Sequence, residues 1–154
     1  MDLYRIEKSR IPVTVTLARG EQVNGDMFIQ GNAEWHFGPE RTADVLNDGL
    51  EFFPLAVGEK DTLLVNKKGV RDVAELSSSR DDWRLVPSWR QQRVELRFLG
   101  GGSLSGTVDL ELPGDHPRLL DFLNKTEAVF VPVLTEGGTR LVNREFIESI
   151  RLLD

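Results

Sequence analysis

The strongest constraint on this chain is an internal repeat, because a duplicated pattern restricts the fold to two copies of one small unit. An Arg-x-x-Asp-x-Leu-Asn motif begins at Arg41 and again at Arg118. In both halves a glycine inside a strand-like segment precedes the motif, and an apolar segment with a proline follows it. Matched residues are 77 to 81 positions apart and keep the same order, which indicates a tandem duplication. The matched pairs include Gly25 with Gly106, Asp44 with Asp121, Pro54 with Pro132 and Asn66 with Asn143.

The pattern of each copy predicts five strands and one short helix. Residues 13–17 alternate apolar and polar side chains, which is the period of a half-buried strand. Gly20 in the first copy and the glycines at 100–102 in the second predict a tight turn after this strand. The Arg-x-x-Asp segment comes soon after a proline, so it predicts one or two helical turns between the second and third strands. The expected strands are 13–17, 23–29, 52–57, 63–65 and 70–76, and then 94–98, 104–112, 129–134, 140–142 and 147–152.

The expected fold class is mainly β, at the margin of α+β, with two tandem five-stranded barrel-like units. The first unit is predicted to span residues 1–76 and the second 92–154, joined by a linker at 77–91 that contains Trp83 and Trp89. A unit of this size has a marginal hydrophobic core, so we expect the two units to bury a shared face. We also expect the two tryptophans to pack against the units, because each offers a large apolar area.

Charge and composition restrict the classes of function. The chain has 154 residues, 25 of them acidic and 19 basic, with a formal net charge of -6. Phosphate backbones and anionic lipid surfaces repel such a chain, which disfavours a nucleic-acid or membrane-surface binder. It has no cysteine, which excludes disulfides and thiolate chemistry and fits a reducing compartment. No window reaches the roughly 20 apolar residues of a membrane span, and residues 1–10 contain no signal-like stretch, so the expected location is the cytoplasm.

The repeated Arg-x-x-Asp pair has two interpretations. In the functional one, Arg41 and Asp44, with Arg118 and Asp121, bind a ligand or partner at two equivalent sites. In the structural one, the arginine and the aspartate form a local ion pair on a helical turn. The leucine of the motif then fills the core, and the asparagine closes the turn because it tolerates the left-handed conformation. The structural interpretation is favoured, since it explains the motif without a ligand.

A basic residue follows the repeated asparagine, Lys67 in the first copy and Arg144 in the second. A phosphate contact is one interpretation, and a turn-forming asparagine followed by a solvated charge is the favoured one. The two histidines, His36 and His116, fall in the loop before each predicted helix, with Trp35 beside the first. Their spacing is not that of a metal site.

No set of nucleophile, acid and base can be traced in the sequence. The serines at 77–79 lie in the linker, and no G-x-S-x-G elbow is present. The glycines at 100–102 lack the remaining residues of a phosphate-binding loop. The sequence therefore predicts no catalytic residue, no metal site and no cofactor. The candidate residues for binding a ligand or partner are Arg41, Asp44, Arg118, Asp121, Trp35, His36 and His116.

The succession of hairpin, glycine, Arg-x-x-Asp-x-Leu-Asn, apolar-Pro strand and Val-Asn-[Lys/Arg] resembles a small bacterial β-rich domain family without an assigned function. The resemblance covers residues 13–76 and 94–152. A looser similarity is to Sm-like and SH3-like small barrels, carried by the glycine steps at 23–27 and 104–108 and by a closing pair of short strands. Resemblance to Sm-like proteins implies RNA binding on a basic surface. This chain departs from that pattern because it is acidic, duplicated and has a helical insertion.

Three functions are consistent with these features. The favoured one is a non-catalytic protein-interaction or scaffold module that presents strand edges or a loop face to a protein partner. The second is a small-ligand sensor or enzyme with a site between the copies. The third is an Sm-like nucleic-acid binder that uses Lys67, Lys68, Arg140 and Arg144. For the oligomeric state, a monomer with pseudo-two-fold symmetry and a dimer both remain open.

Overall fold

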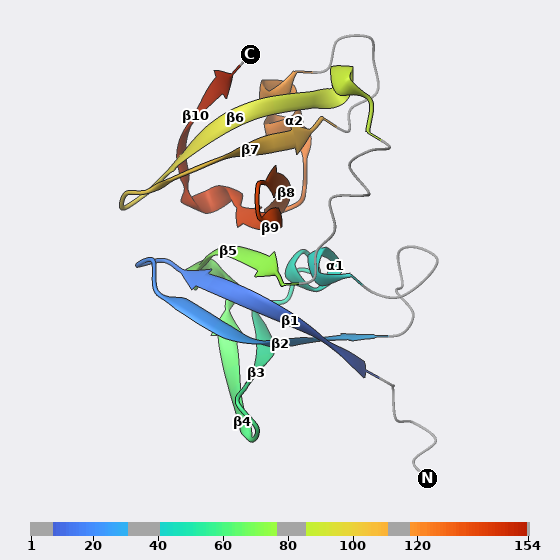
Figure 1. Cartoon of the computed structure of the whole chain (residues 1–154), viewed down its shortest axis with the longest axis vertical. Coiled ribbons are helices and arrows are strands. Elements are labelled where there is room, and N and C mark those ends of the chain that lie inside the picture. Colours follow the sequence, from blue (N-terminus) through green and yellow to red (C-terminus); the bar gives the residue numbers. More distant parts are fainter. Residues whose placement is uncertain (1–7, 31–40, 77–85, 111–117, 154) are drawn as a thin grey trace. The chain divides into compact units, whose positions relative to one another are not determined.

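The structure, a computed structural model, describes residues 8–30, 41–76, 86–110 and 118–153. Strands make up most of these residues, which confirms the expected mainly β class. The chain divides into two compact units, Met1–Leu76 and Ser77–Asp154 (Figure 1). Among the described residues, no helix has the length and apolar character needed to cross a membrane.

The first unit has five antiparallel strands in the spatial order β5-β1-β2-β3-β4. It runs from blue to green in Figure 1. A short α-helix precedes β3, and a 3-10 helix joins β4 to β5. The elements are β1 (Lys8–Leu17), β2 (Gln22–Gln30), α1 (Thr42–Leu46), β3 (Phe52–Val57), β4 (Asp61–Asn66), η1 (Lys67–Gly69) and β5 (Val70–Glu75).

The second unit has the equivalent order, β10-β6-β7-β8-β9. A short α-helix again precedes the third strand of the unit, and a 3-10 helix joins its last two strands. The elements are η3 (Ser88–Arg90), β6 (Gln91–Phe98), β7 (Ser103–Asp109), α2 (Leu119–Lys125), β8 (Phe130–Thr135), β9 (Gly138–Asn143), η4 (Arg144–Phe146) and β10 (Ile147–Leu153).

Both first hairpins form where the turn residues and the alternation predict them. Val13 and Val15 of β1 are fully buried, whereas Thr14 between them is half-buried. Gly20 takes a φ of 90°, and the glycines at 100–102 take φ values of 85°, 106° and 91°, which confirms the predicted turns. β1 begins at Lys8, earlier than expected, because its pairing with β2 continues from Thr16 to Lys8 beyond the alternating segment.

The core of each unit uses matched positions of the repeat. In the second unit Val94, Leu96 and Phe98 of β6 pack with residues of β7, α2, β8 and β9. The corresponding strand of the first unit buries Val13 and Val15. Other buried apolar residues of the first unit are Met27, Ile29, Leu46, Phe53, Leu55, Ala56, Val70 and Val73.

The repeated glycine lies where two strands approach closely. A Cβ atom at Gly25 would lie 2.6 Å from the carbonyl oxygen of Ala56, and one at Gly106 would lie 2.5 Å from that of Leu134. Such distances are far inside van der Waals contact, so any side chain would push the second strand of the unit away from the third. The pairing between these two strands is also short, with Asp26 and Met27 in register with β3. Glycine at this position is therefore required by packing.

Trp89 is 59% exposed, so its expected packing against the units is wrong. It lies in η3, where the next residue, Arg90, donates two hydrogen bonds to Asp109, from Nε to Oδ1 at 3.1 Å and from Nη2 to Oδ2 at 2.9 Å. This bidentate pair, rather than the indole, fixes the segment against β7. Trp83 lies outside the described residues.

Replacing the repeated glycine tests the close approach of the strands. We expect Gly25→Ala and Gly106→Ala each to lower the free energy of unfolding by about 1–3 kcal/mol, because the added methyl group meets a carbonyl oxygen. Urea denaturation followed by circular dichroism measures this change. Gly69→Ala is the control, since a Cβ there meets no atom within 4 Å. Equal stability of all three variants would contradict the packing requirement.

Glu75 makes the stability of the first unit depend on pH. It lies opposite Val13 in the ladder between β5 and β1, and burial raises the pKa of its carboxyl group above the ordinary value. The folded protein therefore holds this proton more tightly than the unfolded chain, so the contribution of Glu75 becomes less favourable as pH rises through its folded pKa. We expect Glu75→Gln to raise the melting temperature at neutral pH, with the gain disappearing below the ordinary pKa of glutamate. A gain that is independent of pH would contradict this assignment.

Candidate functional site

The repeated arginine and aspartate occupy the first turn of each short helix. Arg41 is the N-cap of α1, and its main-chain N–H donates a 2.7 Å hydrogen bond to Oδ2 of Asp44. Arg118 is the N-cap of α2, and Asp121 lies in its first turn. A carboxylate at this position satisfies a main-chain donor and interacts favourably with the positive end of the helix. In the first copy, Asp44 thus accepts a capping bond from the main chain of Arg41.

The rest of the motif is partly as expected. Leu46 is 2% exposed, which confirms that the leucine of the first copy fills the core. The predicted left-handed asparagine is wrong, because Asn47 has a φ of -107° and Gly49 takes the positive φ instead, at 88°. In the second copy Asn124 lies within α2, which is longer than α1. In the first copy, Gly49 takes the left-handed conformation without steric cost, so Asn47 does not need to adopt it.

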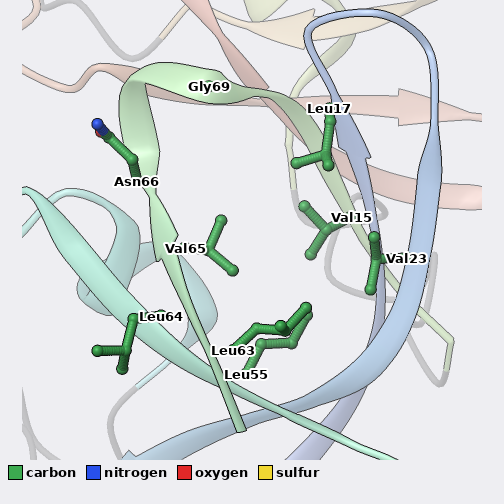
Figure 2. Close-up of a pocket in the computed structure, with 9 residues that line it drawn as sticks. All are labelled: Val15, Leu17, Val23, Leu55, Leu63, Leu64, Val65, Asn66 and Gly69. Carbon is green, nitrogen blue, oxygen red and sulfur yellow. The ribbon is translucent and has the colours of Figure 1, made fainter.

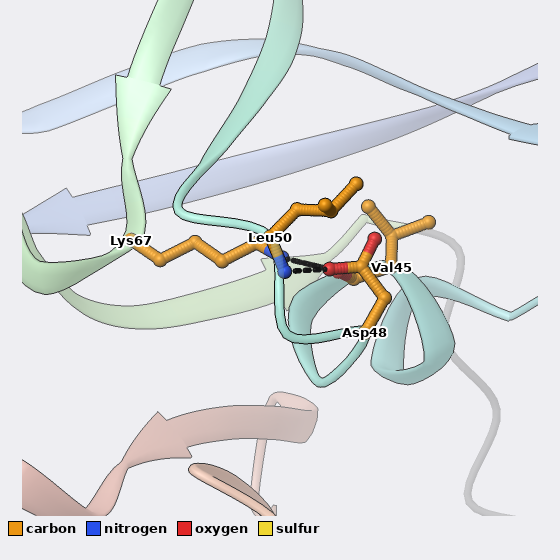
Figure 3. Close-up of polar contacts among 4 residues, drawn as sticks. All are labelled: Val45, Asp48, Leu50 and Lys67. Atoms are coloured by element: carbon orange, nitrogen blue, oxygen red, sulfur yellow. Dashed lines mark hydrogen bonds and ion pairs between the residues drawn. The ribbon is translucent and has the colours of Figure 1, made fainter.

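Lys67 is not the solvated charge that the sequence predicts. Its side chain is only 10% exposed, and its Nζ donates to the carbonyl oxygen of Val45 and to Oδ1 of Asp48, both at 2.6 Å (Figure 3). The same Asp48 oxygen accepts the main-chain N–H of Leu50 at 2.8 Å. The ammonium thus satisfies a carbonyl at the C-terminal end of α1, where a positive charge is stabilised by the helix dipole.

Arg144 makes the equivalent contact in the second unit. Its Nη1 donates to the carbonyl oxygen of Leu123 in α2 at 2.9 Å. The asparagine before each basic residue caps the 3-10 helix, since Asn66 Oδ1 accepts from Lys68 N and Asn143 Oδ1 accepts from Glu145 N. The repeated Asn-[Lys/Arg] pair therefore joins the bend before the last strand to the short helix. Its role is structural in both units.

The remaining candidates lie outside the described residues, namely Trp35, His36 and His116. The structure therefore does not place them near the Arg-x-x-Asp pairs. Within residues 8–30, 41–76, 86–110 and 118–153, no group of three or more His, Asp or Glu side chains is arranged to hold a metal ion.

The surface that the sequence patterns do not reveal is β4 of the first unit. This strand pairs with β3 on one side, and in the described part of the chain its unit places no strand on the other side. It nevertheless carries apolar side chains on both faces, with Leu63 44% exposed and Leu64 72% exposed. The signal was three consecutive apolar residues, 63–65, which a strand with one buried face cannot bury together.

The main-chain groups of β4 divide between its two sides. Lys67 N–H donates to Glu51 O at 2.9 Å, so odd-numbered residues along this ladder form the hydrogen-bonded pairs. Even-numbered residues form the non-hydrogen-bonded pairs. Pro54, which lies opposite Leu64, fits this pattern because proline has no N–H to donate. The N–H and C=O groups of Thr62 and Leu64 therefore point away from β3, toward the open edge.

An apolar groove of about 330 Å³ lies beside this edge. Figure 2 shows Leu63, Val65 and Leu55 facing Val15 and Val23 across the groove, with Leu64 pointing to the opposite side of the strand. Leu17, Leu64, Asn66 and Gly69 complete the lining. The groove thus joins an unpaired strand edge to a row of partly exposed aliphatic side chains.

Comparisons with family models, with curated proteins and with solved structures each find no match to this chain.

Substituting Lys67 tests its contact with α1. We expect Lys67→Met to lower the free energy of unfolding by about 1–3 kcal/mol, because it keeps the apolar stem but removes the hydrogen bonds from the ammonium to the Val45 carbonyl and to Asp48. Lys68→Met is the matched control, since Lys68 is exposed and such changes are usually within about 0.5 kcal/mol. Chemical denaturation measures both. The structural role is contradicted if the two variants are equally stable.

Proposed function

We propose that this chain is a non-catalytic protein-interaction module whose contact surface is β4 together with the adjacent apolar groove. The observation that carries the proposal is an edge strand with outward-facing main-chain groups at Thr62 and Leu64 and apolar side chains on both faces. An extended segment of another polypeptide can add to such an edge, with main-chain hydrogen bonds supplying affinity and side-chain pockets supplying specificity.

The composition of β4 supports a binding role for the edge. Edge strands in monomeric proteins are usually protected by charge, proline or a bulge, because an apolar edge pairs with other chains. β4 has Leu63, Leu64 and Val65 at its centre instead. The matched strand of the second unit carries Arg140 where β4 carries Leu63. Burial of one leucine side chain contributes about 1.5–3 kcal/mol, so covering this edge is strongly favourable.

We further propose that each unit is a small barrel of the Sm-like or SH3-like kind, and that the two units are tandem copies. Both have the same strand order and a 3-10 helix before the last strand. In the first unit, β1 and β4 are separated by β2 and β3 in the sheet, yet Val15 and Leu63 line the same groove. A sheet that curls onto itself accounts for this arrangement.

The other two hypotheses have less support. Lys67 and Arg144, two of the four cations proposed for nucleic acid, are used to hold the short helices. Asp44, a candidate for ligand binding, accepts a capping bond in α1. The chain has no cysteine, and we place the module in the reducing cytoplasm on that basis.

A displayed library of random peptides tests the binding surface. Selected against the wild-type protein at nanomolar concentration, the library is expected to yield peptides with alternating apolar residues. Their binding should be lost in Leu64→Lys, which places a charge at the centre of the edge. Leu152→Lys is the matched control, because Leu152 is also an exposed leucine on a strand, 61% exposed, in the other unit. Failure to enrich any peptide, or equal binding to both variants, would overturn the proposal.

A further inference from the structure

We infer that the second unit binds the phosphate group of a small molecule in a pocket on the outer face of β6 and β10. The pocket has a volume of about 300 Å³ and is lined by Arg97, Ser149, Ile150 and Arg151. It does not involve β4, so the inference is independent of the proposed function. The positions of the two guanidinium groups carry it, together with the matched residues of the first copy, which are not basic.

The register of β6 with β10, drawn in yellow and dark red in Figure 1, places both arginines on the outer face of the sheet. Ser149 lies opposite Arg97, and the next residue on the same face of β10, Arg151, lies opposite Glu95. Leu96, which precedes Arg97 in β6, is 1% exposed in the core, so Arg97 points to the other face. Arg151 is therefore the diagonal neighbour of Arg97, and side chains of this length can reach one ligand together.

The donors of this pocket are available to a ligand. Arg97 forms an ion pair through Nε, at 3.6 Å from Oε1 of Glu95, and its side chain is 60% exposed. An exposed pair of this length is weak, so a ligand can compete with it. Among the residues that the structure describes, none forms an ion pair or a hydrogen bond with the guanidinium of Arg151. The small side chain of Ser149 leaves the space that the two arginines border.

Two guanidinium groups beside a hydroxyl match the chemistry of a phosphate. The planar fork of arginine donates paired, charge-assisted hydrogen bonds to phosphate oxygens. A phosphate monoester carries about 1.5 to 2 negative charges at neutral pH, which two arginines can balance. A volume of about 300 Å³ is at the lower end of the range for small-molecule sites. The net charge of -6 disfavours a long polyanion, so the ligand we infer is a small phosphorylated molecule rather than a nucleic acid.

The first copy shows that the fold requires neither arginine. The residues matched to Arg97 and Arg151 are Thr16 and Ala74, which lie 81 and 77 positions earlier in the chain. At these positions the register of β5 with β1 is the same as that of β10 with β6. The first unit thus forms the same pair of strands with uncharged side chains. The two arginines are therefore a property of the surface of the second unit and not a requirement of its fold.

Titration of the isotope-labelled full chain with inorganic phosphate, followed by amide chemical shifts, tests the pocket. We expect saturable changes at Ser149, Ile150 and Arg151 that sodium chloride at equal ionic strength does not produce. Arg97→Thr and Arg151→Ala introduce the side chains of the first copy. Each should weaken phosphate binding about tenfold or more, because each removes a charge-assisted fork. Arg19→Gln, which removes an exposed arginine of the first unit, is the matched control and should leave binding unchanged.

Glu95→Gln supplies a change in the opposite direction. Its carboxylate competes with the ligand for Arg97, so we expect this variant to bind phosphate more tightly, with a circular dichroism spectrum like that of the wild type. The inference is overturned if phosphate produces no saturable change, if chloride produces the same changes, or if Arg97→Thr and Arg19→Gln bind phosphate equally. Weaker binding in Glu95→Gln would also overturn it. Tighter binding of a short RNA than of phosphate at this face would assign it to nucleic acid and exclude the small-molecule site.

Discussion

The first unit depends on the close approach of β2 and β3 at Gly25. With no side chain at this point, the main chain of β2 can pass against the carbonyl of Ala56, where a Cβ atom would lie 2.6 Å from the oxygen. The sheet can then bend sharply, so that β1 and β4 line one groove although two strands separate them in the sheet. The repeat places Gly106 in the same relation to Leu134, which gives the second unit the same constraint.

The basic residue after the repeated asparagine forms hydrogen bonds to the short helix of each unit. The short helices have few residues, so their ends need partners from elsewhere in the chain. Lys67 and Arg144 supply them from the bend before the last strand. The ammonium and the guanidinium reach carbonyl oxygens at corresponding ends of the two helices. A cation at this position in both copies is therefore explained by the fold, whereas the apolar open edge of β4 is not.

Local chemistry makes part of this structure predictable from the sequence. Alternation along residues 13–17 and the glycine turns depend on neighbouring residues, and the hairpins form there. The role of Lys67 is not predictable in this way, because its partner Val45 is 22 residues away. Asparagine often accepts positive φ, which favours Asn47 for the turn after α1, but Gly49 lies two residues later and does so at no cost. The edge of β4 is not predictable either, because strand order, which sequence periodicity does not fix, determines which strand lacks a neighbour.

The central claim is that the outward main-chain groups of β4 bond to another polypeptide strand, and amide hydrogen exchange tests it most directly. The N–H of Leu63 faces β3, whereas that of Leu64 faces the open edge, so the two neighbours report on the two sides of one strand. The account predicts that exchange at Leu63 is slow with and without a library-selected peptide, and that exchange at Leu64 is fast in the free protein and slows when the peptide binds. Exchange at Leu64 that does not change when the peptide binds would contradict it.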